Sequence, residues 1–170
     1  MGIKMENFLD KVKRLAKEDK KTIVLAEGEE LRTVQAAAAI LKEGFANIIL
    51  LGNESKITAF ADGLDISGAT IIEPEKSDKY EAFADTFYEM RKAKGMTPEK
   101  AKETMKDVLH FGVMLVKQGL ADGMVAGAVN STANVLRPSL QILKTAPNTK
   151  VVSSFFLMVV PNCEYGENGT

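Results

Sequence analysis

Short runs of apolar and β-branched residues alternate with longer amphipathic segments along this chain of 170 residues. The apolar runs are predicted to be strands, and they lie at residues 22–26 (TIVLA), 47–51 (NIILL), 69–72, 123–128 and 150–160. Strands separated by helical segments of about ten or more residues favour βαβ units. We therefore expect an α/β fold, with a mostly parallel, doubly wound sheet and helices on both faces.

The segments between these runs have the apolar spacing of helices. Helices are predicted at residues 6–17, 31–43, 55–61, 77–94, 97–118 and 132–145. Gly44 and Gly95 follow two of them, as glycine often does at the end of a helix. Thr97 and Pro98 suit the start of another, because threonine caps helices and proline is tolerated in the first turn.

Charge and composition exclude several classes of function. The 22 basic and 23 acidic residues give a net charge of -1, so no overall field attracts nucleic acid or an anionic membrane. One cysteine, Cys163, and one histidine, His110, exclude a disulfide framework and a cysteine-based metal cluster. The first residues have mixed charges, and the longest apolar run, 155–160, is too short to span a bilayer. We expect a cytoplasmic protein with no nucleic-acid or membrane partner.

Ligands of parallel sheets bind beyond the carboxyl ends of the strands. The loops at 27–30, 52–55, 73–77 and 127–132 are therefore the places for a site. The sequence has neither a Gly-x-Gly-x-x-Gly motif after its first strand nor a Walker-type loop, so the familiar nucleotide cradles are absent.

A different phosphate site is indicated by the segment GAVNSTANVLRPSLQILKT at residues 127–145. Asn130, Ser131 and Thr132 fall where a helix begins, and a helix start offers free N–H groups and the positive end of a dipole. Arg137 can present a planar fork of donors to phosphate or to an acyl oxygen. The alternative is that Ser131 or Thr132 only caps the helix and Arg137 is a solvated charge.

Pro138 removes a backbone donor inside this predicted helix, which indicates that the helix is not built for regularity alone. Cys163 follows the last predicted strand. A nucleophilic cysteine needs an activating base, and His110 lies in an apolar helical pattern, so a cysteine that lines the site or is structural is favoured over an acyl-cysteine.

Two further charged groups have ordinary explanations. Arg91 lies at the end of a predicted helix, where a cation complements the helix dipole without any ligand. Glu27, Glu29 and Glu30 are not predicted to form a metal site, because no histidine or further carboxylate accompanies them at ligand spacing.

Recognisable motifs add to this interpretation. The segments VLAEGEELRTVQAAA, GAVNSTANVLRPSLQILKT and SFFLMVVPNCEYGENGT resemble the amino-terminal half of phosphate acetyltransferases. The second and third are specific to phosphate acetyl- and butyryltransferases together, and the acetyl family is the closer match.

The resemblance implies an acyltransferase that moves acetyl between coenzyme A and inorganic phosphate in a cleft between two α/β domains. It implies a homodimer, no metal and no bound organic cofactor, with coenzyme A as a substrate. It divides the chain into an amino-terminal domain at 1–147 and the first strand and turn of a second domain at 148–170. The catalytic arginine and aspartate of the second domain would lie outside the chain, so the 170-residue chain alone is expected to be inactive.

The resemblance also assigns roles to residues. Ser131 and Thr132 would contact the phosphoryl group of acetyl phosphate, Arg137 would neutralise that group or the developing oxyanion, and Arg91 would meet a phosphate of coenzyme A. Cys163 would lie near the acyl group without attacking it. The expected site is catalytic Ser131 and Arg137 with substrate-binding Asn130, Thr132, Arg91 and Cys163. Two alternatives stay open: a phosphate butyryltransferase with a larger acyl pocket, and a non-catalytic ligand-binding or dimerisation module of the same fold.

Overall fold

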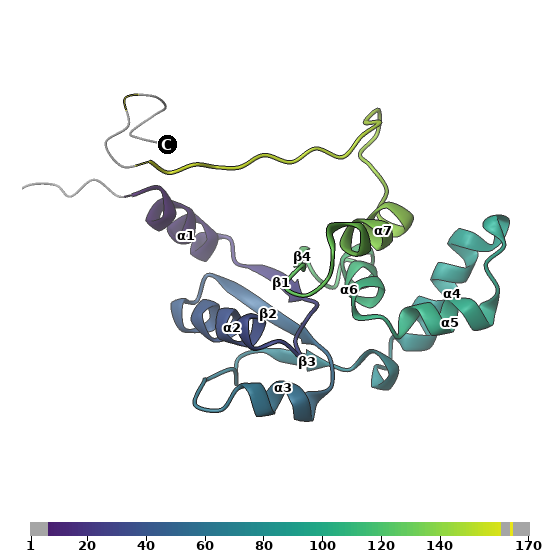
Figure 1. Ribbon diagram of the computed structural model, residues 1–170, viewed down its shortest axis with the longest axis horizontal. Coiled ribbons are helices and arrows are strands. Elements are labelled where there is room, and N and C mark those ends of the chain that lie inside the picture. Colours follow the sequence, from purple (N-terminus) through teal and green to yellow (C-terminus); the bar gives the residue numbers. More distant parts are fainter. Residues whose placement is uncertain (1–6, 161–163, 165–170) are drawn as a thin grey trace, which may run out of the picture.

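The computed structural model describes residues 7–160 and residue 164. Its centre is a sheet of four parallel strands in the order β3-β2-β1-β4 (Figure 1). The strands are β1 (Lys21–Leu25), β2 (Ala46–Leu51), β3 (Thr70–Ile72) and β4 (Gly123–Val125). In the register, Ile23 of β1 lies opposite Ile48 of β2 and Gly123 of β4. The parallel sheet of the predicted fold class is thus confirmed.

One helix precedes the first strand, others connect the strands, and one follows the last described strand. They are α1 (Phe8–Glu18), α2 (Leu31–Glu43), α3 (Glu54–Phe60), α4 (Tyr80–Arg91), α5 (Pro98–Met105), α6 (Val108–Lys117) and α7 (Thr132–Ile142). Two short 3-10 turns, η1 (Pro74–Lys76) and η2 (Lys92–Lys94), precede and follow α4. In the part of the chain that the structure describes, none of these helices is long and apolar enough to cross a membrane.

The sheet separates two apolar cores. On one face, Leu25 and Leu50 pack with Val34 of α2 and Ile57 of α3. The other face packs against the later helices, and its core includes Val24, Ile49, Phe83, Phe87, Phe111 and Met114. Consecutive residues of β1, Val24 and Leu25, therefore lie in different cores, as expected for a strand that is covered on both sides.

Helix α6 approaches the sheet closely because it carries a glycine there. A β-carbon at Gly112 would lie 2.7 Å from Sδ of Met124, 3.1 Å from Cδ1 of Leu51 and 3.3 Å from Cγ1 of Val24. Helix α6 also packs against α7, so it links the sheet to the helix that begins beyond β4.

The predicted helix at 97–118 is wrong in one respect, because it is two helices. The chain leaves α5 after Met105 and starts α6 at Val108. Between them Asp107 has an extended backbone (φ -69°, ψ 124°), and its carboxylate accepts the N–H of His110 at 3.0 Å. This capping bond stabilises a new helix start at Asp107.

Strand β4 is shorter than the predicted strand at 123–128, because it ends at Val125. The backbone N–H groups of residues 127–130 donate instead to the side chain of Glu27, which follows β1.

The predicted strand at 150–160 is wrong for the part of the chain that the structure describes. These residues form an extended segment that runs back toward α1, separate from the sheet, without pairing to any described strand (Figure 1). Their apolar side chains are exposed, and Phe155 and Phe156 are 88% and 92% accessible. A β-prone sequence becomes a strand only when a neighbouring strand supplies hydrogen bonds. The proposed domain division at 147 stays a prediction.

Candidate functional site

The winding of the sheet reverses between β1 and β4. From β1 the chain proceeds to β2 and β3 on one side, and it returns to add β4 on the other side of β1. In open α/β sheets such a reversal leaves a crevice at the carboxyl ends of the two strands, and ligands bind there. Here the crevice lies between the segment 26–30 after β1 and the loop 127–131 after β4.

A pocket of about 280 Å³ occupies this position. Its lining residues come from the segment 26–30, from Leu51 and Gly52 at the end of β2, from Val108, and from Val129 and Asn130 of the loop. Two of the loops that the sequence indicated, 27–30 and 127–132, therefore meet in one place.

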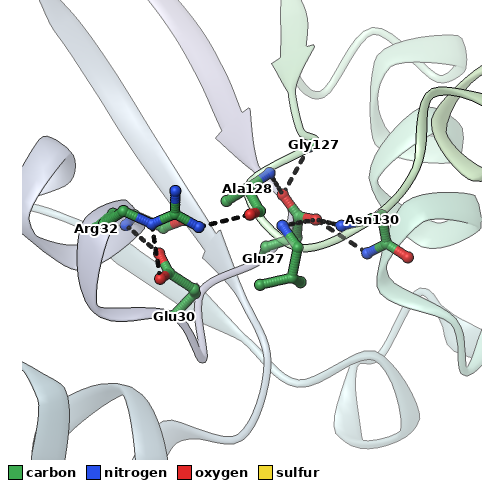
Figure 2. A network of polar contacts seen from close by, with 8 residues as sticks. Glu27, Glu30, Arg32, Gly127, Ala128 and Asn130 are labelled. Atoms are coloured by element: carbon green, nitrogen blue, oxygen red, sulfur yellow. Dashed lines mark hydrogen bonds and ion pairs between the residues drawn. The ribbon is translucent and has the colours of Figure 1, made fainter.

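Glu27 joins the two loops (Figure 2). Its Oε2 accepts the backbone N–H groups of Gly127 at 2.7 Å and Ala128 at 2.6 Å. Its Oε1 accepts the N–H of Val129 at 3.1 Å, the N–H of Asn130 at 2.8 Å and Nδ2 of Asn130 at 2.9 Å. The residue is 7% exposed, so these five donors take the place of water around a buried carboxylate.

The hydrogen bonds decide the ionisation of Glu27. Burial raises the pKa of the carboxyl group, but the amide of Asn130 and the backbone N–H groups of Val129, Asn130 and Ala128 together outweigh it. The resulting pKa is lowered from 4.5 to about 2. Glu27 is therefore a carboxylate at neutral pH, and the loop is folded around a fixed negative charge.

Helix α7 begins directly after this loop. Ser131 is its N-cap, and the serine Oγ accepts the N–H of Asn134 at 3.3 Å. The capping interpretation is thus correct for this oxygen as an acceptor, while the hydroxyl hydrogen stays available as a donor. Thr132 is the first helical residue, and both side chains are exposed. The first N–H groups of a helix have no partner within it, so this end of α7 offers donors to an anion.

Arg137 lies further along α7 and is exposed. Within the described residues its guanidinium makes no hydrogen bond or ion pair, so its donors are available to a ligand. Pro138 follows inside the helix and is buried, with the helix continuing to Ile142.

Arg32 is a functional candidate that the sequence interpretation missed. Its Nη2 donates to the carbonyl of Ala128 at 2.6 Å, and its Nε pairs with Glu30 at 2.9 Å (Figure 2). The side chain is 68% exposed, so a cation stands at the rim of the crevice. Glu27 was missed as well, because it was considered only as a metal ligand. The available signal was its position, because Glu27 comes directly after a buried strand, in a loop that was already predicted to be part of a site.

The structure does not bring every predicted site residue together. Asn130 lines the pocket, Ser131 and Thr132 follow it as the N-cap and the first residue of α7, and Arg137 lies further along the same helix. Arg91 ends α4 at the turn toward α5, where its carbonyl accepts the N–H of Met96 at 3.4 Å. None of its contacts among the described residues joins it to the crevice. Its Nε atom is buried at the end of α4 and has no hydrogen-bond partner among the described residues. Cys163 lies outside the described residues.

A second, larger pocket of about 560 Å³ lies at the ends of β2 and β3. Its polar lining includes Asn53, Glu73, Lys76 and Ser77, and it contains none of the predicted site residues. We place the candidate site at the smaller pocket because the sheet reverses there and α7 begins shortly after Asn130, which lines this pocket. Among residues 7–160 and 164, no group of three or more histidine, cysteine, aspartate or glutamate side chains is arranged to hold a metal ion.

The fold and the crevice define an α/β protein with a candidate ligand site at the point where its sheet reverses. Comparison with known proteins narrows this class. Residues 7–168 match the family described as phosphate acetyl/butaryl transferase, and the chain belongs to this family.

The names of individual relatives agree with this family assignment. The chain is 60% identical over 164 residues to the phosphate acetyltransferase of Acetivibrio thermocellus, a match that covers 96% of this chain and 49% of that protein. It is 52% identical over 165 residues to the phosphate acetyltransferase of Clostridium acetobutylicum, covering 96% and 50%. The chain thus spans about half the length of these curated relatives.

Solved structures share the fold. The EutD phosphotransacetylase from Staphylococcus aureus superposes with a TM-score of 0.78 at 37% identity, covering 86% of this chain and 46% of that one. A phosphotransacetylase from Streptococcus pyogenes gives 0.76 at 40% identity, covering 86% and 44%.

Proposed function

We propose that the protein containing this chain is a phosphate acetyltransferase, which interconverts acetyl-CoA and phosphate with coenzyme A and acetyl phosphate. The observation that carries the proposal is the start of α7, where two exposed hydroxyls and the first N–H groups of the helix directly follow Asn130, which lines the pocket at the sheet reversal. Its family membership supports the same reaction. The relatives named above are phosphate acetyltransferases, which favours acetyl over butyryl as the acyl group.

In the proposed reaction the thiolate of coenzyme A attacks the carbonyl carbon of acetyl phosphate. A carbon–sulfur bond forms, the carbon–oxygen bond to the phosphate breaks, and phosphate leaves with the bonding electrons. Negative charge develops on the acyl oxygen and on the leaving phosphate, so fixed donors and cations that stabilise these groups lower the barrier.

Each residue of the site has a part in this proposal. Ser131 and Thr132 donate hydroxyl hydrogen bonds to the phosphate oxygens, beside the first N–H groups of α7. Arg137 neutralises the phosphate or the acyl oxyanion with its exposed guanidinium. Asn130 completes the site by holding the loop, since its side-chain N–H is bonded to Glu27.

The remaining assignments follow the family. Arg91 contacts a phosphate of coenzyme A, and Cys163 lines the acyl site without forming an acyl-enzyme. The reaction uses no metal and no organic cofactor other than the substrate coenzyme A. A base for the thiol comes from the part of the longer relatives that this chain does not match, so the 170-residue chain alone is expected to be inactive. We further propose a cytoplasmic homo-oligomer.

The test joins this chain to the carboxyl-terminal half of the A. thermocellus enzyme; we call the product the chimera. Formation of acetyl-CoA from acetyl phosphate is measured for the chimera, for the 170-residue chain and for the unaltered relative. We expect turnover by the chimera, none by the chain alone, and slower use of butyryl phosphate. A folded chimera that binds coenzyme A and phosphate by calorimetry but transfers no acetyl group would favour a non-catalytic module instead.

A further inference from the structure

The carboxylate of Glu27 fills a position that an anionic ligand would otherwise suit. Four consecutive backbone N–H groups, from Gly127 to Asn130, converge on its two oxygens. Successive N–H groups that converge in this way form an anion-binding concavity. In this chain the anion is a side chain of the protein itself.

We propose that Glu27 is the positioning residue of the phosphate subsite: by occupying the N–H groups of residues 127–130, it fixes the direction in which α7 begins. This inference rests on the proposed function. Glu27 touches no substrate in this account and acts through the loop.

Hydrogen bonds on both sides restrict the backbone conformation of the loop at residues 127–130. The peptide groups on both sides of Ala128 are held, because its N–H bonds to Glu27 at 2.6 Å and its carbonyl accepts Arg32 at 2.6 Å. Ser131 follows the last bonded N–H group directly and caps α7. The direction of the Ser131 and Thr132 hydroxyls is therefore set by a carboxylate at the end of β1.

Phosphate is not expected to bind at the backbone N–H groups of residues 127–130. A buried carboxylate already accepts the four N–H groups, and a second anion beside it would be repelled. Phosphate is left with the donors on the α7 side of the loop: the hydroxyls of Ser131 and Thr132, the first N–H groups of α7, and Arg137.

The first experiment compares the chimera with its Glu27→Gln variant. Glutamine is close in size but places an NH₂ group against backbone N–H donors, so the loop loses its register. We expect the KM values for phosphate and acetyl phosphate to rise about tenfold to hundredfold, because small misplacements of binding groups have effects of this size. The KM for coenzyme A should change less than about twofold, a split that general destabilisation would not produce. Glu43→Gln, which alters an exposed carboxylate at the end of α2, is the matched control and should leave both values unchanged.

The second experiment starts from the unaltered chain, so its main result does not depend on a variant that might misfold. Hydrogen exchange of the 170-residue chain should show slow amides at residues 127–130 without any ligand. Glu27→Asp, which keeps the charge but shortens the reach, should speed their exchange less than Glu27→Gln does.

The outcomes separate the two proposals. An active chimera whose KM for phosphate is unchanged by Glu27→Gln would overturn the positioning role, as would fast exchange at 127–130 in the unaltered chain. Addition of inorganic phosphate is expected to slow the exchange of the Thr132 and Ala133 amides. Faster exchange of the amides at 127–130 instead would show that phosphate displaces Glu27, which would contradict the positioning role. An inactive wild-type chimera with slow amides at 127–130 would overturn the proposed function but would still support the hydrogen bonds between Glu27 and the loop.

Discussion

Arg32 and Ala128 are 96 residues apart in the sequence, and Nη2 of the arginine donates a hydrogen bond to the carbonyl of Ala128 at 2.6 Å. The bond connects the first turn of α2 to the loop that precedes α7. The start of α2 is thereby connected, at the rim of the crevice, to the loop that leads into α7.

Replacement of Arg32 by alanine tests this connection. We expect a loss of stability of about 1 kcal/mol or less, because the guanidinium is largely exposed. The KM for phosphate in the chimera should rise several-fold, since one side of the loop is released. Lysine should restore the phosphate affinity only in part, because it lacks the planar fork that reaches Ala128 and Glu30 together. Arg14→Ala, which alters an exposed arginine of α1, is the control, and an equal effect of the two changes would argue against a local role.

Acid should weaken the fold through Glu27. Its folded-state pKa of about 2 lies below the ordinary 4.5, so its contribution to stability is fully present above pH 4.5 and is lost as the pH falls toward 2. The shift corresponds to roughly 3 kcal/mol at neutral pH. Urea unfolding at pH 7, 4 and 3 measures it. The stability difference between the wild-type chain and Glu27→Gln should shrink as the pH falls, and a constant difference would contradict the assignment.

Arg137→Ala in the chimera should reduce turnover about a hundredfold to a thousandfold, because a charge-assisted contact to the transition state is lost. The melting temperature should stay within a few degrees, since the exposed guanidinium has no partner among the described residues. Lysine should rescue the activity partly. Lys42→Ala, a cation of α2 that lines another part of the surface, serves as the control. Unchanged turnover in Arg137→Ala would remove this residue from the site.

The extended residues 150–160 should make the isolated chain associate. Exposed apolar side chains and unpaired backbone groups together promote pairing with another chain. Sedimentation of the 170-residue chain should show oligomers, and changing Phe155 and Phe156 to serine should shift it toward monomers. Oligomers that persist unchanged in the double variant would place the contact elsewhere, for example on the exposed apolar side of α1.

The accuracy of the sequence predictions follows the range of the interactions involved. Runs such as TIVLA and NIILL predicted β1 and β2 because burial on both faces leaves a local signature. The N-cap at Ser131 was also local. The hydrogen bonds of Glu27 were not predictable in this way, because their donors lie 100 to 103 residues away in the sequence. The strand at 150–160 failed for the same reason, since a strand depends on a neighbour that composition does not reveal.

The close approach of α6 to the sheet has a consequence for how this family can vary. Gly112 faces Sδ of Met124 at a distance that leaves no room for another carbon, so the two positions share a fixed volume. An alanine at 112 is expected in relatives whose residue at 124 is smaller than methionine, and rarely otherwise. The methionine is the partner that should change first, because the far end of a flexible side chain moves more easily than Val24 in the strand. The close contact between α6 and the sheet therefore predicts that positions 112 and 124 change together, and an alignment of homologous sequences can check this.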